Sequence, residues 1–223
     1  MTGNRIDSPA LECRFCRIGA GKTHAGYDRV LMESDDYFAI PSIGGFVEGW
    51  TLVCAKRHTL NLSQDYREAA FQEFAREVAE VISSAYGDVV VFEHGVSTSG
   101  SLTGCGTDHA HLHLVPFRGS FVQQVLANDG KRAWVRTPAR DLERAIDGRE
   151  YLLMADTADE LSASVHVSIV DQPQSQFFRK ILAAGMGVGG QFDYRLFPFT
   201  DSAERTAARL GALAGERLTT AAI

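Results

Sequence analysis

A run of alternating residues at positions 109–116 places the strongest constraint on how this chain folds. It reads His-Ala-His-Leu-His-Leu-Val-Pro, so three histidines recur at a spacing of two. Side chains of a β-strand point alternately to its two faces, which predicts that His109, His111 and His113 line one face of a strand. The small and apolar residues between them would face a hydrophobic core.

A row of imidazoles on one face suits chemistry better than packing. Three of the seven histidines of the chain fall in this run, and polar rings are costly to bury unless each finds a partner. Neutral imidazole nitrogens bind metals, contact phosphate groups or act as nucleophiles near neutral pH. The run is therefore a candidate metal site, phosphate site or catalytic centre.

A loop rich in glycine, serine and threonine, at residues 95–107, leads into this strand. Glycine lets a ligand approach the backbone closely, and successive backbone N–H groups form nests that bind anions. We expect Ser99, Gly104, Cys105 and Gly106 to hold a phosphate in front of the histidines. Taken alone, such a loop is also compatible with a flexible hairpin connection.

The remaining pattern predicts an α+β fold, an antiparallel sheet with one long helix. Apolar residues recur at helical spacing over 64–86, after an N-cap at Ser63 and before a helix-ending Gly87. A C-terminal α/β extension follows, in which 151–155 and 165–170 are expected to pair as strands. We divide the chain into a disordered tail at 1–10, a first domain at 11–118 and an extension at 119–223 that packs on it. Strands are also expected at 29–33, 37–40, 50–55 and 88–93, and helices at 120–127, 175–184 and 203–217.

Composition narrows the partners and the compartment. The net charge is −6, which argues against broad nucleic-acid binding because that needs a dominant basic face. No apolar stretch approaches the roughly 20 residues of a membrane-spanning helix, and the first ten residues lack the apolar core of a signal peptide. We expect a cytoplasmic protein with reduced cysteines, in which Cys13-x-x-Cys16 points to metal or redox chemistry before a disulfide.

The histidine run and its surroundings resemble the histidine-triad (HIT) superfamily. The hallmark of that family is His-φ-His-φ-His-φ-φ, with φ apolar, and residues 109–115 match it. The segment Phe92-Glu-His-Gly95, the glycine loop after it, and the segment Gly49-Trp-Thr-Leu-Val-Cys-Ala-Lys-Arg-His58 are similar as well. The resemblance covers about residues 11–117 and implies a HIT-like sheet.

The resemblance implies nucleotidyl transfer at a site that contains His109, His111 and His113. His111 would attack the α-phosphorus of a nucleotide conjugate, such as a dinucleoside polyphosphate or a nucleoside phosphoramidate, and His113 would contact phosphate oxygens and assist the leaving group. Hydrolysis is the favoured outcome, since the third histidine is intact. Transfer to phosphate or a sugar phosphate, non-catalytic nucleotide binding, and a zinc-dependent structural module remain alternatives. Because relatives often dimerise, a homodimer is expected.

The resemblance also implies a structural zinc ion. Family members with an N-terminal Cys-x-x-Cys, including galactose-1-phosphate uridylyltransferases, pair it with two histidines that correspond to His58 and His109. Two thiolates and two imidazoles form a closed tetrahedral zinc site. The predicted ligands are therefore Cys13, Cys16, His58 and His109, and the alternative is two free thiols with a surface histidine.

Two positions depart from the family pattern, and three further polar residues are expected to have no role in the site. His94 stands where many relatives have Asn, so it would orient the catalytic region, contact phosphate, compete as a metal ligand, or be an ordinary histidine at the entry of the loop. Trp50 stands where many hydrolases have His, which puts typical pocket geometry in doubt. We expect His166 to be structural, and Arg179 and Lys180 to lie on a solvated helix face.

Overall fold

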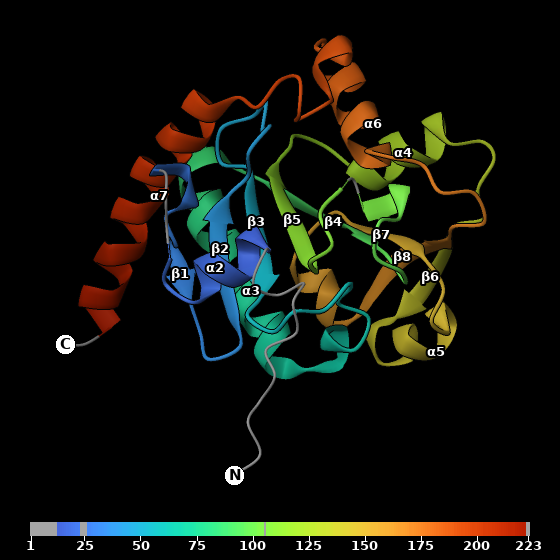
Figure 1. Cartoon of the computed structure of the whole chain (residues 1–223), viewed down its shortest axis with the longest axis horizontal. Helices are drawn as coiled ribbons and strands as arrows, with labels where there is room; N and C mark the ends of the chain where they lie inside the picture. Colours follow the sequence, from blue (N-terminus) through green and yellow to red (C-terminus); the bar gives the residue numbers. More distant parts are fainter. Residues whose placement is uncertain (1–12, 23–25, 105, 222–223) are drawn as a thin grey trace.

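The computed structural model describes residues 13–22, 26–104 and 106–221. The predicted tail at 1–10 and Cys105 lie outside these residues. Eight strands and a set of α- and 3-10 helices alternate along the described chain (Figure 1). The strands are β1 Met32–Glu33, β2 Tyr37–Pro41, β3 Thr51–Ala55, β4 Val89–Gly95, β5 His111–Pro116, β6 Val135–Pro138, β7 Tyr151–Ala155 and β8 Ser164–Ile169. The α-helices are α2 Arg14–Gly19, α3 Ala69–Tyr86, α4 Phe121–Asn128, α5 Leu142–Ile146, α6 Phe177–Gly185 and α7 Thr200–Ala221. The 3-10 turns are η1 Gly26–Asp28, η2 Asp65–Arg67, η3 Leu102–Gly104, η4 Ala139–Asp141, η5 Asp159–Ser162 and η6 Gly189–Gln191.

All eight strands form one antiparallel sheet in the order β1-β2-β3-β5-β4-β7-β8-β6. The histidine strand β5 therefore lies between β3 and β4, inside the sheet. The predicted α+β class, with an antiparallel sheet and one long helix, is confirmed.

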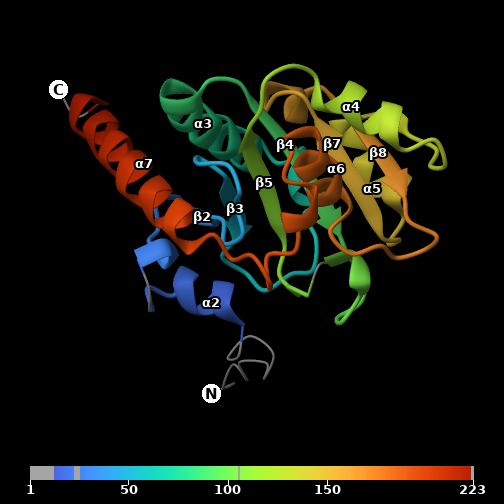
Figure 2. The same ribbon diagram turned by 90° about the horizontal axis from the view of Figure 1, so that it is seen from above.

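The alternation of β5 divides the core into two layers, one on each face of the sheet. Ala110, Leu112 and Leu114 pack with α3 and the apolar side chains of β2, β3 and β7. The opposite layer combines residues of α2, α4 and α6 with Phe92 and Trp50. Figure 2 shows α2 and α3 on opposite sides of β2 and β3. The histidines consequently face the layer that contains α2 and α6.

The long helix begins later than its sequence pattern predicts. The chain first makes the 3-10 turn η2, and α3 begins at Ala69 with Glu68 as its N-cap residue. Ser63 is therefore not the N-cap, and its hydroxyl donates to Asn61 Oδ1 (2.7 Å). Apolar side chains of η2 and α3 lie in the same buried layer. The apolar pattern of the sequence therefore continues through both elements and predicted a single helix. Gly87, with φ of 89°, ends the helix as predicted.

The chain after residue 118 extends the same sheet. β7 pairs with β4 along its whole length, from Val91–Ala155 to Gly95–Tyr151, and β8 and β6 follow outward. The predicted pairing of 151–155 with 165–170 is confirmed, whereas β6 and α5 were not predicted. The strand expected at 29–33 is shorter, since residues 26–28 form a 3-10 turn and β1 begins at Met32.

The last helix, α7, runs back along the first half of the sheet (Figures 1 and 2). Its buried face carries Ala203, Ala207 and Leu210, and it contacts α3, β2 and η1. Within the ranges that the structure describes, no helix is long and apolar enough to cross a bilayer.

Candidate active site and metal centre

The three histidines approach one another at the start of β5. The strand begins at His111, and His109 directly precedes it, anchored by its Nε2–H donating to the Ala55 carbonyl (2.7 Å). The rings of His111 and His113 lie 4.8 Å apart, and Phe15 of α2 contacts the rings of both His109 and His111 at 5.5 Å. The predicted common face is therefore present.

The hydrogen bond of His111 fixes which of its nitrogens is free. Its Nδ1 lies 2.7 Å from the His109 carbonyl oxygen, which can only accept a hydrogen bond. Nδ1 must therefore carry the proton, and in the neutral ring Nε2 keeps its lone pair. Burial lowers the pKa of His111, which favours this neutral form.

His113 has the opposite tautomer because of Trp50. The Trp50 indole can only donate, and its Nε1 lies 3.0 Å from Nδ1 of His113. The proton of neutral His113 therefore lies on Nε2. The ring also stacks on Phe92, with centroids 4.4 Å apart and planes 16° from parallel. Burial, with smaller contributions from His111, His94 and Arg179, holds the pKa of His113 well below its usual value.

His111 and His113 line a partly open cavity of about 80 Å³. The wall combines strand residues with residues of α2 and of the C-terminal part of the chain. Its lining residues are Arg14, Phe15, Ser42, Ile43, Leu52, His94, Gly104, Thr107, His111, His113, Arg179 and Tyr194.

The glycine loop contributes to this wall in part. Gly104 lies on the cavity wall, whereas Ser99 lies on an exposed part of the loop and is not among the lining residues. Gly106, with φ of 82°, lies against Arg195, so closely that a Cβ there would meet Arg195 Nη2 at 1.8 Å. The loop therefore brings Gly104 beside His111 and His113 and Gly106 beside the C-terminal segment, and it leaves Ser99 at the surface.

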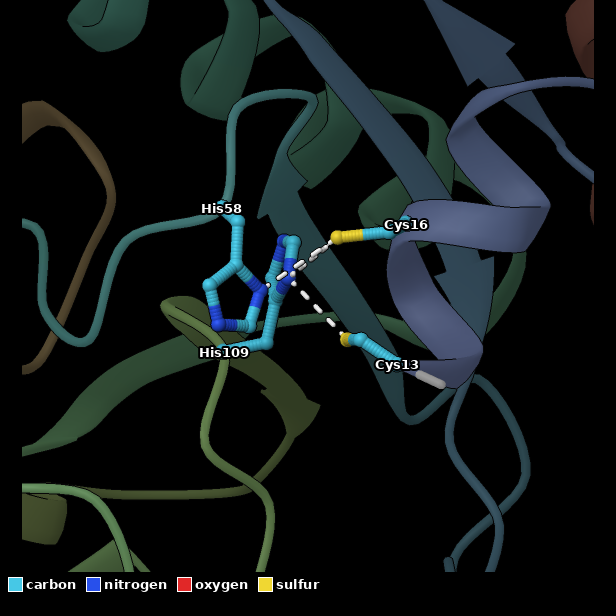
Figure 3. Close-up of side chains that lie close together, drawn as sticks. All are labelled: Cys13, Cys16, His58 and His109. Carbon is cyan, nitrogen blue, oxygen red and sulfur yellow. Dashed lines mark hydrogen bonds between the residues drawn. The ribbon is translucent and has the colours of Figure 1, made fainter. Parts of the chain in front are cut away.

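Two thiols and two imidazoles converge beside the triad (Figure 3). The side chains of Cys13, Cys16, His58 and His109 point toward one another, and their ligand atoms all lie within 4.8 Å of one another. Nδ1 of His109 is 3.4 Å from Cys13 Sγ and 3.5 Å from Cys16 Sγ. Nδ1 of His58 is 3.3 Å from Cys16 Sγ.

This geometry fits a tetrahedral metal ion. Zinc bond lengths of about 2.3 Å to sulfur and about 2.05 Å to nitrogen imply an S···N edge of roughly 3.6 Å, close to the observed separations. The hydrogen bond from His109 Nε2–H to Ala55 also leaves Nδ1 free to coordinate, as ligating histidines require. The predicted ligands thus come together in a cluster that can hold a metal.

Without a bound metal, the surroundings of Cys16 favour its neutral thiol over the thiolate. Burial, and then the nearby Cys13, raise the pKa of Cys16 to about 12. Burial lowers the pKa of His109 to about 4. A bound divalent cation reverses the balance at the thiols, since it deprotonates a coordinating thiol outright. The neutral imidazole of His109 is already in the form that binds metal.

Comparison with known proteins identifies the family. Uncharacterised HIT-like proteins from two strains of Mycobacterium tuberculosis are 32% identical to this chain over 110 residues, which cover 48% of this chain and 73% of theirs. The chain belongs to the HIT superfamily. No family model matched the sequence.

Two solved structures were also similar. A hypothetical histidine triad nucleotide-binding protein from Sulfolobus tokodaii is 22% identical, with a TM-score of 0.39 over 48% of this chain and 70% of that chain. A HIT family hydrolase from Clostridium thermocellum is 21% identical, with a TM-score of 0.36 over 48% of this chain and 90% of that chain.

His94 of this HIT protein is built into the wall of the cavity. Its Nε2 accepts a long hydrogen bond (3.5 Å) from the Phe178 amide at the start of α6, so its proton lies on Nδ1. Its ring is 6.0 Å from that of His113. Burial lowers the pKa of His94 to about 3, which keeps the ring neutral. His94 thus links the triad to the C-terminal part of the chain.

Arg179 was expected on a solvated helix face, and this prediction is wrong. Its side chain is among the buried charged groups, at 3% exposed, and lines the triad cavity. The helix α6 is packed on both sides, because Phe178 and Leu182 enter the core while Arg179 faces the cavity. His166 lies on β8, away from the triad cavity, as expected.

Proposed function

We propose that this HIT protein hydrolyses a nucleotide conjugate at its α-phosphorus, with His111 as the nucleophile. The observation that carries the proposal is the hydrogen bond from His111 Nδ1 to the His109 carbonyl, which leaves the Nε2 lone pair of a cavity-lining imidazole available. A lone pair held in this way favours attack on phosphorus and formation of a covalent nucleotidyl-histidine.

The neighbouring side chains support the same step. His113 carries its proton on Nε2, so it can donate to a phosphoryl oxygen while Trp50 holds its other nitrogen. Backbone N–H groups near Gly104 would stabilise the negative charge that develops on the phosphoryl oxygens. In the first step the bond from His111 to phosphorus forms and the bond to the leaving group breaks. Water then attacks the intermediate and releases a nucleoside monophosphate.

We propose that the cluster of Cys13, Cys16, His58 and His109 holds zinc in a structural role. Four protein ligands complete a tetrahedron and leave no open position for substrate. The metal would join α2 to the residue that accepts the hydrogen bond from His111. We also propose that the protein acts in the cytoplasm as a homodimer.

The test is a comparison of the zinc-loaded protein with two histidine variants on a panel of nucleotide conjugates, with the products identified by mass spectrometry. His111→Ala should abolish release of the nucleoside monophosphate. His166→Gln, a histidine on β8 outside the cavity, should retain it. Repeating the assay with inorganic phosphate separates hydrolysis from phosphorolysis, because phosphorolysis yields a nucleoside diphosphate. Equal turnover by the wild-type protein and His111→Ala would refute the proposal.

A further inference from the structure

The C-terminal part of the chain supplies a buried cation to the triad cavity. Arg179 lies in the first turn of α6, and its side chain shares the cavity wall with His111, His113 and Tyr194. An acid lies nearby: the pKa of Asp193 is lowered first by the hydrogen bond from the Arg195 amide and also by the charge of Arg179, although Asp193 does not line the cavity. Burial of a guanidinium costs free energy, and this cost points to a function for Arg179 in the cavity.

The guanidinium is fixed in orientation. Its Nε donates to the Phe192 carbonyl (2.9 Å), and its Nη2 donates to the Gly44 carbonyl. Its plane lies over the Trp50 ring, 4.6 Å from the ring centre, and is 5.6 Å from the centre of Phe46. Carbonyl oxygens and ring faces hold the group in place while it keeps its full positive charge, so the cavity contains a preorganised cation.

The charge of Arg179 reaches the histidines. After burial and the effect of other histidines, Arg179 is one of the causes that lower the pKa of His94 and of His113. Arg179 also contacts Trp50, the residue that sets the tautomer of His113. Arg14 also lines the cavity, but it is paired with the Asp28 carboxylate. The guanidinium of Arg179, set among neutral imidazoles, therefore favours an anion in the cavity.

The size of the cavity limits what that anion can be. Its volume of about 80 Å³ is well below the roughly 300–1,000 Å³ of sites that enclose a whole drug-sized ligand. A space of this size therefore suits a phosphoryl group, and a complete nucleoside would extend outside it.

We propose that Arg179 is a phosphate-binding residue that contacts the phosphoryl oxygens of the substrate opposite His111. The proposal rests on the proposed function for the place of the substrate, and it extends the site to a residue outside the triad strand and the glycine loop. It assigns to the segment after residue 118 a direct role in recognising the phosphorylated part of the substrate.

The test measures the binding of ligands with and without a phosphate. Isothermal titration of inorganic phosphate, nucleoside 5′-monophosphates and the matching nucleosides is carried out on the zinc-loaded wild type, R179M and R179K. R179M should weaken the binding of phosphate and of the monophosphates by about 10- to 100-fold, since a hydrogen bond to a charged group is lost. Affinity for the nucleosides should stay within about twofold, and R179K should lie between R179M and the wild type because it keeps the charge but loses the planar fork.

Arg132 provides the matched control. Its guanidinium also lies 4.6 Å from the centre of an aromatic ring, that of Phe177, but it lines a different cavity. R132M should bind all the ligands like the wild type. Binding of phosphate by R179M within about twofold of the wild type would overturn the proposal. So would an equal loss of nucleoside and monophosphate affinity, which would indicate a purely structural role.

A second measurement leaves Arg179 unchanged, so it does not depend on the folding of R179M or R179K. In a W134F protein, Trp50 is the remaining tryptophan, and Arg179 lies on its face. Phosphate binding should change the fluorescence of Trp50, with the same midpoint as the calorimetric titration. Phosphate binding without such a change, or no phosphate binding by the wild type, would overturn the proposal. Turnover that survives in H111A would instead refute the proposed function, and it would leave the binding result for Arg179 intact.

Discussion

Trp50 is the residue that decides the protonation of the third histidine. Its indole donates to His113 Nδ1, so the proton of His113 is placed on Nε2. Many relatives were expected to have histidine at this position. Here the indole N–H of Trp50 provides the hydrogen-bond donor to His113. The departure from the family pattern is thus compatible with an ordered triad.

Replacement of Trp50 by phenylalanine should cost both stability and turnover. Trp50→Phe leaves a buried acceptor on His113 without its donor, which costs about 1–3 kcal/mol of the free energy of unfolding. This loss can be measured by urea denaturation, and kcat on the substrate found above should fall with it. Trp134→Phe, which alters an indole outside the triad cavity, should retain wild-type kcat. Wild-type stability and kcat in Trp50→Phe would show that this hydrogen bond has no role.

Glu93 gives the fold a dependence on pH that is independent of the triad. Its carboxyl group is fully buried and receives hydrogen bonds from Tyr66 (2.7 Å), Tyr151 (2.6 Å) and the Leu62 amide (2.8 Å). Burial raises its pKa from 4.5 to about 7, against the effect of those hydrogen bonds.

The sign of this pH dependence follows from proton binding. Between pH 4.5 and 7 the unfolded chain loses the proton of Glu93 while the folded chain keeps it. The contribution of Glu93 to the free energy of unfolding is therefore fully present below about pH 4.5. It falls by about 3 kcal/mol as the pH rises to 7. Glu93→Gln should lack this decline when chemical denaturation is repeated across the pH range. Parallel curves for the two proteins would contradict the pKa assignment.

At the residue scale, the sequence predicted the triad face and the cluster of two cysteines and two histidines, but not the tautomers or the place of Arg179. Spacing shows which side chains share a face, so the triad histidines could be placed from the sequence. Whether a helical arginine faces water or a cavity depends on what packs over its helix. The segment that packs near Arg179, at residues 192–195, lies outside α6, and Phe192 is 13 residues away from Arg179 along the chain. Physical contact across such distances leaves no local pattern.

At the scale of elements, the first helix is short and depends on its contacts with the rest of the chain. α2 has six residues, too few to be stable alone in water. Cys13 and Cys16 lie at its N-terminal end, and its apolar residues Phe15 and Ile18 are buried against the sheet. A metal in the cluster would add a second attachment, from α2 to the start of β5.

Metal removal should therefore lower the melting temperature and loosen α2. For a chain of this length each lost kcal/mol corresponds to roughly 2–4 °C, so we expect a fall of several degrees after dialysis against a chelator, restored by zinc. Cys16→Ala should lose the metal by elemental analysis. Cys54→Ala, which changes a cysteine buried in β3 outside the cluster, should keep one zinc per chain. Full loading of Cys16→Ala would exclude the cluster as the site.

Helices and strands could be predicted where their periodicity was undisturbed. β7, β8, α4 and α6 lie close to their expected positions, and Ser120 caps α4 by accepting from the Gln123 amide (3.0 Å). The strand β6 was not predicted, since three of its four residues are exposed and it shows little apolar alternation. Short edge strands are defined by their neighbours and not by their own residues.

At the scale of the whole molecule, the pairing of β4 with β7 unites the two halves of the chain. The strand β4 carries His94 and Glu93 and also borders the triad strand. This pairing joins segments about 60 residues apart, and the sequence predicts the two strands but not that they are neighbours. The proposed homodimer cannot add a strand at β4, because both of its sides are already paired.

One continuous sheet should unfold as a unit. In native-state hydrogen exchange, amides of β3 and β5 and those of β7 and β8 should share the free energy of global opening to within about 1 kcal/mol. The measurement uses the intact zinc-loaded protein. Exchange of β7 and β8 at a much lower free energy, while β3 and β5 stay protected, would show that residues 119–223 unfold as a separate domain.

The segment at 192–198 has a consequence for the timing of the reaction. Phe192 accepts from Arg179, Pro198 accepts from the Gly44 amide, and Tyr194 between them borders the cavity. A nucleoside is larger than a cavity of this volume, so a bound nucleotide would extend past the wall that Tyr194 helps to form, and we expect this segment to move as substrate enters and product leaves. Opening would break hydrogen bonds at both of its ends, and such steps often limit turnover in enzymes with closing loops. The rate of the cycle would then be set by the exchange of ligands with solvent, and the bond cleavage at His111 would be the faster event.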